Sequence, residues 1–388
     1  MNSDQPSAGS LVPRGPALSA FTTLRLGGRA RSVITCTDTE ELVGVVRRLD
    51  AAGERVLLIG GGSNLVVADE GFDGTAVIIA DSSINFGVDA AAGGRSYVTA
   101  GAGVPWDHVV AAACERGLGG LECLSGIPGA AGATPVQNVG AYGVEVGALL
   151  RSVQLMDRVT GTLAWVDPAD LELGYRTSRL KHHDRELVVA VSLWLHADGL
   201  SEPISYRELA TALGVGEGDR AATAGVRHQV IALRRGKGMV LDGADHDTWS
   251  AGSFFTNPII TAERLPAVLA KIAERVGDAP VPQFPVASQF PVGLRYPVGQ
   301  QSSAPDSRGG RSVKLSAGWL IERAGFAKGY PGASAPVRLS TKHTLALTNR
   351  GAATTADLLA LARVVRDGVA DAFGVTLEPE PILVGCSL

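Results

Sequence analysis

Apolar residues recur with helical and strand periods along most of the chain. Leu42, Val45, Val46 and Leu49 are spaced as on one face of a helix, and Gly53 supplies a stop. Similar patterns predict helices over residues 105–116, 220–235, 261–276, 317–324 and 354–373. Short apolar runs predict strands over residues 55–59, 66–67, 76–80 and 96–100, and mainly strands between 152 and 195.

Three stretches depart from these patterns. Glycines interrupt residues 236–243, where we expect a second compact region to begin. Residues 280–311 contain a period-six repeat, namely Gln283-Phe-Pro-Val, Gln289-Phe-Pro-Val and Arg295-Tyr-Pro-Val. Prolines at this density resist helix and sheet, so we expect an inserted and mostly disordered loop, with a partner-binding motif as the alternative. Near the N-terminus, Ser10–Gly15 resembles a protease-cleavage scar from an expression vector, although a natural origin stays open.

Composition narrows the class of protein. A chain of 388 residues with 45% apolar residues suggests two or three domains with large cores. The net charge of -4 gives no basic bias, so nucleic acid is not favoured as a partner. The four cysteines show no CxxC spacing, which argues against zinc or a disulfide framework and fits a reducing cytosol. With no apolar run of membrane-spanning length and no apparent secretory signal, we expect a cytoplasmic protein without membrane insertion. We also expect a monomer without a metal site.

The run from Gly117 to Gly143 fits neither an amphipathic helix nor an alternating strand. Many of its positions carry almost no side chain, among them Gly126, Gly129, Ala130, Ala131, Gly132, Ala133 and Ala141. Backbone of this kind can approach a flat or charged ligand closely. A flexible linker is the alternative, but the interleaved Leu121, Leu124, Ile127 and Val136 are typical of buried positions. The run is therefore a candidate binding segment.

A second glycine-rich turn, Gly60-Gly61-Gly62-Ser63-Asn64-Leu65, follows a predicted strand. Its glycines free backbone N–H groups to form a nest for a pyrophosphate, and Ser63 and Asn64 add donors. The turn is neither a GxGxxG that leads into a helix nor a P-loop. A tight turn between two strands remains the alternative.

Four short motifs carry polar residues that suit a site. Arg176 lies in Gly174–Ser178, Ser253 in Ala251–Pro258, Glu378 and Glu380 in Leu377–Pro381, and Lys237 in Arg234–Gly238. Each also has a structural explanation: a solvated arginine, a serine in a cap or turn, a solvated acidic tail, and a basic cluster at a helix end. Ser253 is not part of a GxSxG elbow, so hydrolase chemistry is poorly supported.

In their order along the chain, these motifs resemble those of the UDP-N-acetylenolpyruvoylglucosamine reductases, a flavoenzyme family of peptidoglycan synthesis. The run from Gly117 to Glu145 is similar to the family's flavin-binding segment GLxGLExLxGIPGxxGAxPxQNxGAYGxE. GGGSNL is similar to its pyrophosphate loop, GYRTS to its GYRxS, GSFFTNP to its GSFFxNP, and the C-terminal segment to its LxxE. The chain departs from many members at Pro381-Ile382, where an arginine commonly follows the glutamate.

The resemblance implies an α+β fold built on the FAD-binding fold of the vanillyl-alcohol oxidase type. Residues 18–84, completed by 377–388, are expected to form a first FAD-binding subdomain, and residues 85–243 a second one. Residues 244–376 are expected to form an α+β substrate-binding domain that carries the inserted loop at 280–311. Residues 1–17 are expected to be a tag or a disordered N-terminus.

The resemblance also implies roles for single residues. Arg176 is expected to hold the substrate carboxylate beside the flavin, Glu380 to stabilise the enol form or orient the acid, and Ser253 to donate the proton. Lys237, Asn257, Tyr206 and Arg234 are expected to bind substrate, with a packed or edge position as the alternative for Tyr206. The residues expected to contact FAD are Gly60, Gly61, Gly62, Ser63, Asn64, Leu65, Ser125, Gly126, Ile127, Pro128, Gly129, Gly132, Ala133, Gln137, Asn138, Gly140, Ala141, Tyr142 and Gly143.

The implied activity is that of an oxidoreductase, a UDP-N-acetylmuramate dehydrogenase. NADPH first reduces FAD, and UDP-N-acetylglucosamine enolpyruvate then enters the same pocket and receives hydride at its methylene carbon. The product, UDP-N-acetylmuramate, serves peptidoglycan synthesis and thereby cell shape and division. Two alternatives are less favoured. A flavoprotein oxidase with covalent flavin would need a histidine or cysteine that residues 60–74 lack, and a non-catalytic nucleotide-sugar binder would not need Ser253 or Glu380.

Overall fold

A parallel three-stranded sheet forms the N-terminal part of the protein. The structure is a computed structural model and describes residues 15–285 and 312–388. In this sheet β4 (Phe72–Ile79) lies between β1 (Ala30–Cys36) and β2 (Val56–Ile59), and α1 (Thr39–Ala51) connects the two outer strands. Asp38 begins α1 by accepting the backbone N–H of Glu41 at 2.8 Å. The helix buries its predicted apolar stripe, including Leu42, Val45 and Val46, against the sheet.

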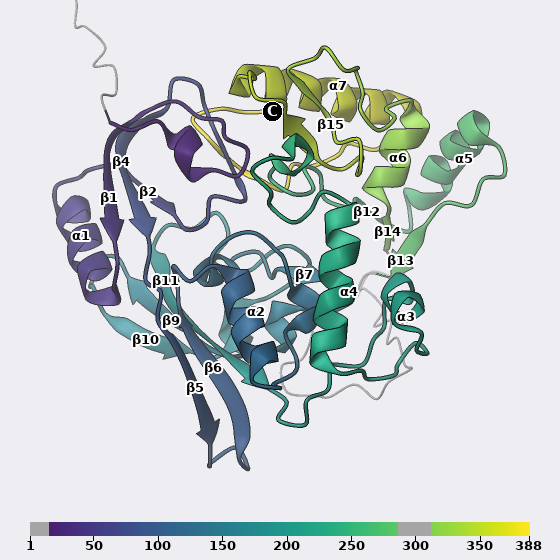
Figure 1. The fold of residues 1–388 in the computed structure, drawn as a ribbon. Coiled ribbons are helices and arrows are strands. Elements are labelled where there is room, and N and C mark those ends of the chain that lie inside the picture. The colour runs from purple at the N-terminus through teal and green to yellow at the C-terminus, as the bar shows by residue number, and fades with distance from the viewer. Residues whose placement is uncertain (1–14, 286–311) are drawn as a thin grey trace, which may run out of the picture.

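An antiparallel five-stranded sheet forms the middle of the chain. Its strand order is β10-β9-β11-β6-β5, with the bounds Leu163–Val166, Leu150–Asp157, Glu186–Leu195, Arg95–Gly101 and Ile84–Asp89. α2 (Trp106–Glu115) packs against β6 of this sheet, α4 (Thr223–Gly236) packs against α2, and the short α3 (Arg207–Leu213) packs beside α4 (Figure 1). Trp106 is buried in this core, and its indole N–H donates to the carbonyl of Leu124 at 3.0 Å.

The C-terminal part combines three helices with short strands. α5 (Leu265–Val276) and α6 (Ala317–Ala324) pack against the long α7 (Thr355–Phe373) (Figure 1). The strands are β12 (Ile259–Ile260), β14 (Val313–Leu315) and β13 (Gln283–Pro285) in one antiparallel sheet, and β15 (Val337–Leu339) and β16 (Leu347–Asn349) in a hairpin. α7 begins with a capping box between Thr354 and Asp357 and buries Leu358, Ala362, Val365 and Val369 at helical spacing.

The last residues of the chain return to the N-terminal part. β17 (Ile382–Val384) pairs parallel with β3 (Leu65–Val67), which begins at the last residue of the glycine-rich turn Gly60–Leu65. Figure 1 shows the C-terminus lying between the N-terminal sheet and α7. The two ends of the chain therefore build one region.

The remaining regular elements are small. β7 (Gly140–Ala141) and β8 (Val144–Glu145) form a short hairpin inside the long glycine-rich run. Short 3-10 helices cover Leu18–Phe21, Glu122–Leu124, Ala131–Ala133, Val146–Ala148, Pro168–Leu171 and His246–Thr248. Within residues 15–285 and 312–388, no helix has the length and apolar character needed to cross a membrane.

The described edges of two segments that are expected to be irregular make ordered contacts. Gln283–Pro285, inside the expected insert 280–311, forms β13 and pairs with β14. β13 is an edge strand, and an edge strand tolerates proline because the missing N–H need not face a neighbouring strand. Gly15 donates its N–H to the carbonyl of Ala30 at 2.9 Å, so ordered chain begins before residue 18. The expectations for residues 1–14 and 286–311 lie outside the described residues, and the domain boundaries stay a prediction.

Asp69 fastens the start of α7 to the end of β3. Its two carboxylate oxygens accept the backbone N–H groups of Thr355 and Ala356 at 2.7 and 2.9 Å. The hydroxyl of Thr355 donates to the carbonyl of Val67 at 2.6 Å. Asp69 thus satisfies two N–H groups that a helix leaves open in its first turn and places a negative charge at the positive end of the helix dipole.

We expect Asp69→Ala to lower the free energy of unfolding by about 1–2 kcal/mol, because both N–H groups lose their partner. Urea denaturation followed by circular dichroism measures the change. Glu70→Ala, which removes the neighbouring exposed carboxylate, is the control and is expected to change stability by less than about 0.5 kcal/mol. Equal losses in the two variants would contradict the role of Asp69.

Candidate active site

Two glycine-rich segments approach each other at backbone distance. A Cβ atom at Gly61 would lie 2.6 Å from the Cα of Gly129, and a Cβ atom at Gly62 would lie 1.8 Å from the carbonyl oxygen of Phe21. Gly62 also has a φ of +59°, where side chains other than glycine are strained. Gly61 is therefore required for the two segments to meet, and Gly62 is required for the turn to pass close to Phe21.

The two segments line a cavity of about 350 Å³, a volume within the range of small-molecule sites. Asn64 and Gln137 join them, because Asn64 Nδ2 donates to Gln137 Oε1 at 2.9 Å. The predicted cofactor residues in the cavity lining are Gly60, Gly61, Gly62, Ser63, Asn64, Leu65, Ile127, Pro128, Gly129, Ala133, Gln137 and Gly140. The two motifs found in the sequence thus form one wall.

The other predicted cofactor residues lie outside this lining. They are Ser125, Gly126, Gly132, Asn138, Ala141, Tyr142 and Gly143. The hydroxyl of Ser125 is buried and donates to the carbonyl of Glu122 at 2.6 Å. A Cβ atom at Gly132 would lie 2.5 Å from the Cβ of Ala102. Ser125 and Gly132 therefore support the wall from behind.

Asn138 organises the chain around the turn that carries Arg176. Its Nδ2 donates to Glu145 Oε2 at 2.9 Å and to the carbonyl of Gly174 at 3.1 Å. Its Oδ1 accepts the N–H of Gly147 at 2.9 Å. Because these contacts occupy its amide and its side chain is buried, Asn138 positions the Gly174 turn within the protein.

Arg176 is held inside the site by two partners. It occupies a tight turn in which Gly174 and Thr177 pair, with a φ of +54°. Its Nη2 donates to the carbonyl of Gly140 at 2.9 Å, and its Nε lies 3.2 Å from Oε1 of Glu380. The side chains of Arg176 and Glu380 are only 22% and 14% exposed, so this arginine is not solvated at a strand end.

Lys181 adds a second cation, which the sequence analysis does not identify. Its Nζ donates to the carbonyl of Arg176 at 3.0 Å, and the residue lines the same cavity. Burial raises the pKa of Glu380, and the charges of Arg176 and Lys181 oppose that rise. Burial also lowers the pKa of Lys181, and the negative charge of Glu380 opposes this decrease. Its place in an irregular stretch just after GYRTS is the only sequence signal for Lys181.

Hydrogen bonds between two backbone segments place Ser253 beside Glu380. The N–H of Glu380 donates to the carbonyl of Phe254 at 2.9 Å, and the N–H of Thr256 donates to the carbonyl of Glu378 at 3.0 Å. Ser253 and Glu380 therefore line the same cavity. Glu378 is exposed and lines a neighbouring cleft instead, so the two carboxylates have different surroundings.

Arg234, carried by α4, contributes a buried cation to the cavity lining. Its Nη2 donates to the carbonyl of Met239 at 2.8 Å, whereas its buried Nε has no hydrogen-bond partner within the described residues. Burial lowers the pKa of Arg234 to about 10. A buried guanidinium with an unused donor favours an anionic partner such as a phosphate group.

Asn257 lies outside the cavity lining, at the start of α6. Its Oδ1 accepts the N–H of Ala317 at 2.9 Å. Asn257 lines the neighbouring cleft, which has a volume of about 570 Å³ and shares Arg176 and Lys181 with the cavity. These two cations therefore stand between the cavity and the cleft.

Lys237 and Tyr206 also lie outside the cavity lining and contact protein partners. Lys237 Nζ lies 2.5 Å from Glu208 Oε2. Tyr206 is 42% exposed, and its ring packs edge-to-face on Tyr142 with centroids 5.3 Å apart. Tyr206 is thus a partly exposed tyrosine that packs on one side only. Its contact with substrate stays a prediction.

Known proteins resemble this chain over nearly its whole length. Residues 244–384 match the family described as UDP-N-acetylenolpyruvoylglucosamine reductase, C-terminal domain, and residues 30–167 match the family described as FAD binding domain. The UDP-N-acetylenolpyruvoylglucosamine reductase of Nocardia farcinica is 56% identical over 98% of this chain and 91% of its own length. That of Saccharopolyspora erythraea is 58% identical over 96% of this chain and 96% of its own length.

A solved structure shows the same fold. The crystal structure of the UDP-N-acetylenolpyruvylglucosamine reductase from Thermus caldophilus matches with a TM-score of 0.60 and 23% sequence identity. The match covers 95% of this chain and 97% of that chain. The expected α+β fold with an FAD-binding part is thereby confirmed.

His343 lies in a mostly buried, positively charged environment near Arg234 and Lys237. Burial, together with the charges of Lys237, Lys328 and Arg234, lowers the pKa of His343 to about 4 from an ordinary value of 6.5. The folded protein therefore keeps this imidazole neutral at pH values where the unfolded chain protonates it. The resulting stabilisation is present above the unfolded pKa and is lost as the pH falls toward the folded one.

When the pH falls from about 7.5 to about 5, we expect the free energy of unfolding to decrease by about 2 kcal/mol because His343 stays neutral in the folded protein. His343→Gln is expected to lack this loss. Denaturation at both pH values measures the difference. His228→Gln, which changes an exposed histidine on α4, is the control and is expected to keep the pH dependence of the wild type. The same pH dependence in both variants would show that His343 is not held neutral.

Proposed function

This chain belongs to the UDP-N-acetylenolpyruvoylglucosamine reductase family, and on that premise we propose that it reduces UDP-N-acetylglucosamine enolpyruvate to UDP-N-acetylmuramate, with FAD as its bound cofactor and NADPH as its reductant. It is an oxidoreductase and a flavoprotein. The proposed setting is peptidoglycan precursor synthesis in the cytoplasm, and the proposed form is a monomer. These finer assignments rest on the resemblance of the motifs and on the geometry of the cavity.

One arrangement supports the proposal more than any other. Arg176, Ser253 and Glu380 come from three distant segments of the chain and line the same cavity as the two glycine-rich segments. Reduction of a double bond conjugated to a carboxylate needs an anchor for that carboxylate, a proton donor, and compensation for developing negative charge. The guanidinium of Arg176, the hydroxyl of Ser253 and the ammonium group of Lys181, which lines the same cavity, can meet these needs together.

The cavity walls also fit a flavin that carries a pyrophosphate. Residues 60–65 and 127–137 offer backbone with little side chain, and Arg234 offers a buried donor whose Nε is unpaired in the described part of the chain. Backbone N–H groups and a guanidinium of this kind suit a diphosphate. When bound there, FAD supplies the hydride carrier that links NADPH to the substrate.

Arg176 is suited to hold the carboxylate of the enolpyruvyl group. The carbonyl of Gly140 and the carboxylate of Glu380 fix its guanidinium, and its remaining N–H donors can engage an anion. As hydride reaches the methylene carbon, negative charge develops on the adjacent carbon and spreads into the carboxylate. The positive charges of Arg176 and Lys181 stabilise it there.

Ser253 completes the reduction by transferring its hydroxyl proton to that adjacent carbon. A C–H bond forms, the serine O–H bond breaks, and the two cations compensate the alkoxide until solvent returns the proton. Glu380 orients these groups, because its backbone is hydrogen-bonded beside Ser253 while its carboxylate faces Arg176. The proton donor and the cation thereby act on the same part of the substrate.

We expect Ser253→Ala to separate the two halves of the reaction. The variant is expected to retain FAD and to be reduced by NADPH at close to the wild-type rate, because neither step uses the hydroxyl. Reoxidation of its flavin by the enolpyruvyl substrate is expected to slow by about 10²–10⁴-fold. Anaerobic stopped-flow absorbance of the flavin measures both rates.

Ser152→Ala on β9 is the matched control, because Ser152 lies on the five-stranded sheet away from the cavity. It is expected to behave as the wild type in both halves. Unimpaired reoxidation in Ser253→Ala would refute the role of Ser253 as proton donor. A wild-type protein that is never reoxidised by this substrate would refute the proposed function itself.

A further inference from the structure

The segment from Asp242 to Ser250 leads into Ser253 and forms a closed loop. The hydroxyl of Thr248 donates to the carbonyls of Asp242 and Asp245 at 2.7 and 2.8 Å, and the N–H of Asp242 donates back to that hydroxyl at 3.0 Å. We call this segment the 242–250 loop. These bonds join the start of the loop to Thr248 near its end.

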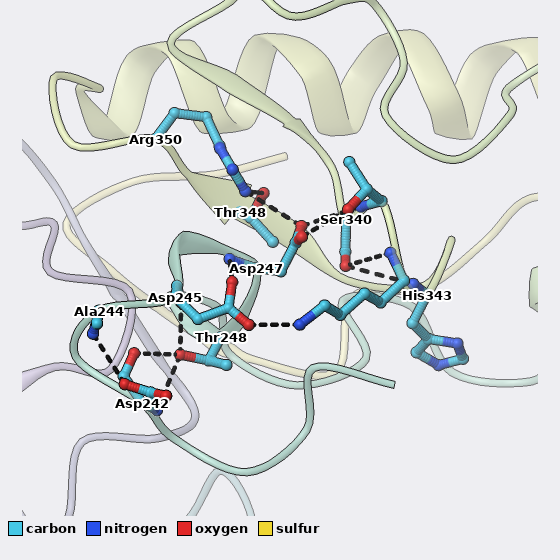
Figure 2. Close-up of polar contacts among 11 residues, drawn as sticks. Asp242, Ala244, Asp245, Asp247, Thr248, Ser340, His343, Thr348 and Arg350 are labelled. Atoms are coloured by element: carbon cyan, nitrogen blue, oxygen red, sulfur yellow. Dashed lines mark hydrogen bonds and ion pairs between the residues drawn. The ribbon is translucent and has the colours of Figure 1, made fainter. Parts of the chain in front are cut away.

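Asp247 anchors the 242–250 loop to the β15–β16 hairpin (Figure 2). Its Oδ1 accepts the N–H of Thr341 at 2.9 Å and Nη1 of Arg350 at 3.1 Å. Its Oδ2 accepts the hydroxyl of Thr341 at 2.6 Å. Asp247 is 5% exposed, whereas the neighbouring tie between Lys342 and Asp245 is more open to solvent. Asp247 is therefore the buried anchor of the loop.

The surroundings of Asp247 favour its ionised form. Burial raises the pKa of Asp247, but hydrogen bonds from Thr341 and Ser340 and the charge of Arg350 outweigh burial and keep the pKa below its ordinary value. A carboxylate held in this way accepts strong, charge-assisted hydrogen bonds. Loss of the negative charge would leave Arg350 without its counter-ion at this position.

Beyond the anchor, the chain runs along the same hairpin toward the cavity. The N–H of Asn349 donates to the carbonyl of Trp249 at 3.0 Å, and the N–H of Phe254 donates to the carbonyl of Leu345 at 2.7 Å. The hairpin thus holds the chain on both sides of Ser253. The register of the hairpin against the 242–250 loop therefore contributes to the position of Ser253.

The residues between these contacts face the cavity. Ser250, Ala251, Gly252 and Ser253 line it, as does Thr248 just before them, whereas Asp247 does not. Gly252 has a φ of +71°, and a Cβ atom placed on it would meet nothing within 4 Å. Gly252 itself has no side chain to pack. Its neighbours Ala251 and Phe254 are buried, and the carbonyl of Ser250 accepts the hydroxyl of Thr23 at 2.7 Å, so these contacts hold this part of the chain together with the anchors at either end.

We propose that Asp247 is a positioning residue for the proton donor: through Thr341 and Arg350 it fixes the 242–250 loop against the hairpin and thereby sets the place of Ser253 in the cavity. This inference rests on the proposed function, because it assigns Asp247 to the half-reaction in which Ser253 donates a proton. Catalytic steps are sensitive to ångström-scale misplacement of the reacting groups, so a small shift of the loop lowers the rate.

A double-mutant cycle on the holoenzyme tests the proposal. The rate of flavin reoxidation by saturating UDP-N-acetylglucosamine enolpyruvate is measured in the wild type, Asp247→Asn, Ser253→Ala and the double variant. Asn keeps the shape of Asp and removes its charge. Asp247→Asn is expected to slow reoxidation by about 10–100-fold, mainly in kcat rather than in KM. In the Ser253→Ala background it is expected to slow reoxidation by less than about twofold, because the group that it positions is gone.

Asp50→Asn is the matched control. Asp50 on α1 pairs with Arg158 at 2.6 Å, and the side chains of this aspartate and arginine are 24% and 14% exposed, yet neither residue lines the cavity. Its reoxidation rate is expected to stay within about twofold of the wild type. If Asp247→Asn does not fold, Thr341→Val in the same cycle removes the hydroxyl that donates to Asp247 and keeps the backbone bond, with an expected slowing of about 3–10-fold.

The outcomes separate the proposal from the function on which it rests. Equal slowing by Asp247→Asn in both backgrounds would show that Asp247 acts on the fold as a whole, and no slowing in the wild-type background would show that it positions nothing. Either result overturns the inference while the wild type still turns over and Ser253→Ala is still impaired. Failure of the wild type to turn over, or full activity of Ser253→Ala, would overturn the function or the role of Ser253, and this inference with it.

Discussion

Glu380 is the residue on which the geometry of the site depends, because it contacts all three parts of the protein. Its backbone N–H is bound by the carbonyl of Phe254 at 2.9 Å, and its own carbonyl accepts Asn64 Nδ2 at 3.3 Å. Its carboxylate lies 3.2 Å from Nε of Arg176. The next bond, from the N–H of Ile382 to the carbonyl of Asn64 at 2.9 Å, continues into the pairing of β17 with β3. The site therefore exists only when the end of the chain is in place.

The buried charges of the site have to be placed together, because each needs its partner. A carboxylate as deeply buried as that of Glu380 is unfavourable without a partner, and Arg176 and Lys181 supply the compensating charge. Arg176 in turn stands on a turn held by Asn138, whose amide bonds reach Glu145, Gly174 and Gly147. The glycine-rich run thus contributes twice: some of its residues line the cavity, and others carry the hydrogen bonds that place the cation.

Local sequence patterns account for much of the fold and for part of the site. Each predicted helix is present, because apolar residues at helical spacing, caps and glycine stops act over a few residues. β1 escapes prediction because Arg31, Ser32 and Thr35 break its apolar run, and strands of two or three residues such as β12 carry too little pattern. The family motifs identify Arg176, Ser253 and Glu380, but their convergence depends on contacts across the whole chain. Lys181 lies in an irregular segment and Asp247 in a 3-10 helix of three residues, so their contacts become visible only in the structure.

The most direct test of this account follows the flavin absorbance of the purified protein with FAD bound. Anaerobic addition of NADPH is expected to bleach the oxidised band, and UDP-N-acetylglucosamine enolpyruvate added next is expected to restore it, because both reagents act on the same flavin. A band that bleaches but does not return on addition of this substrate would contradict the proposed function. A protein that cannot bind FAD would contradict the account of the cavity itself.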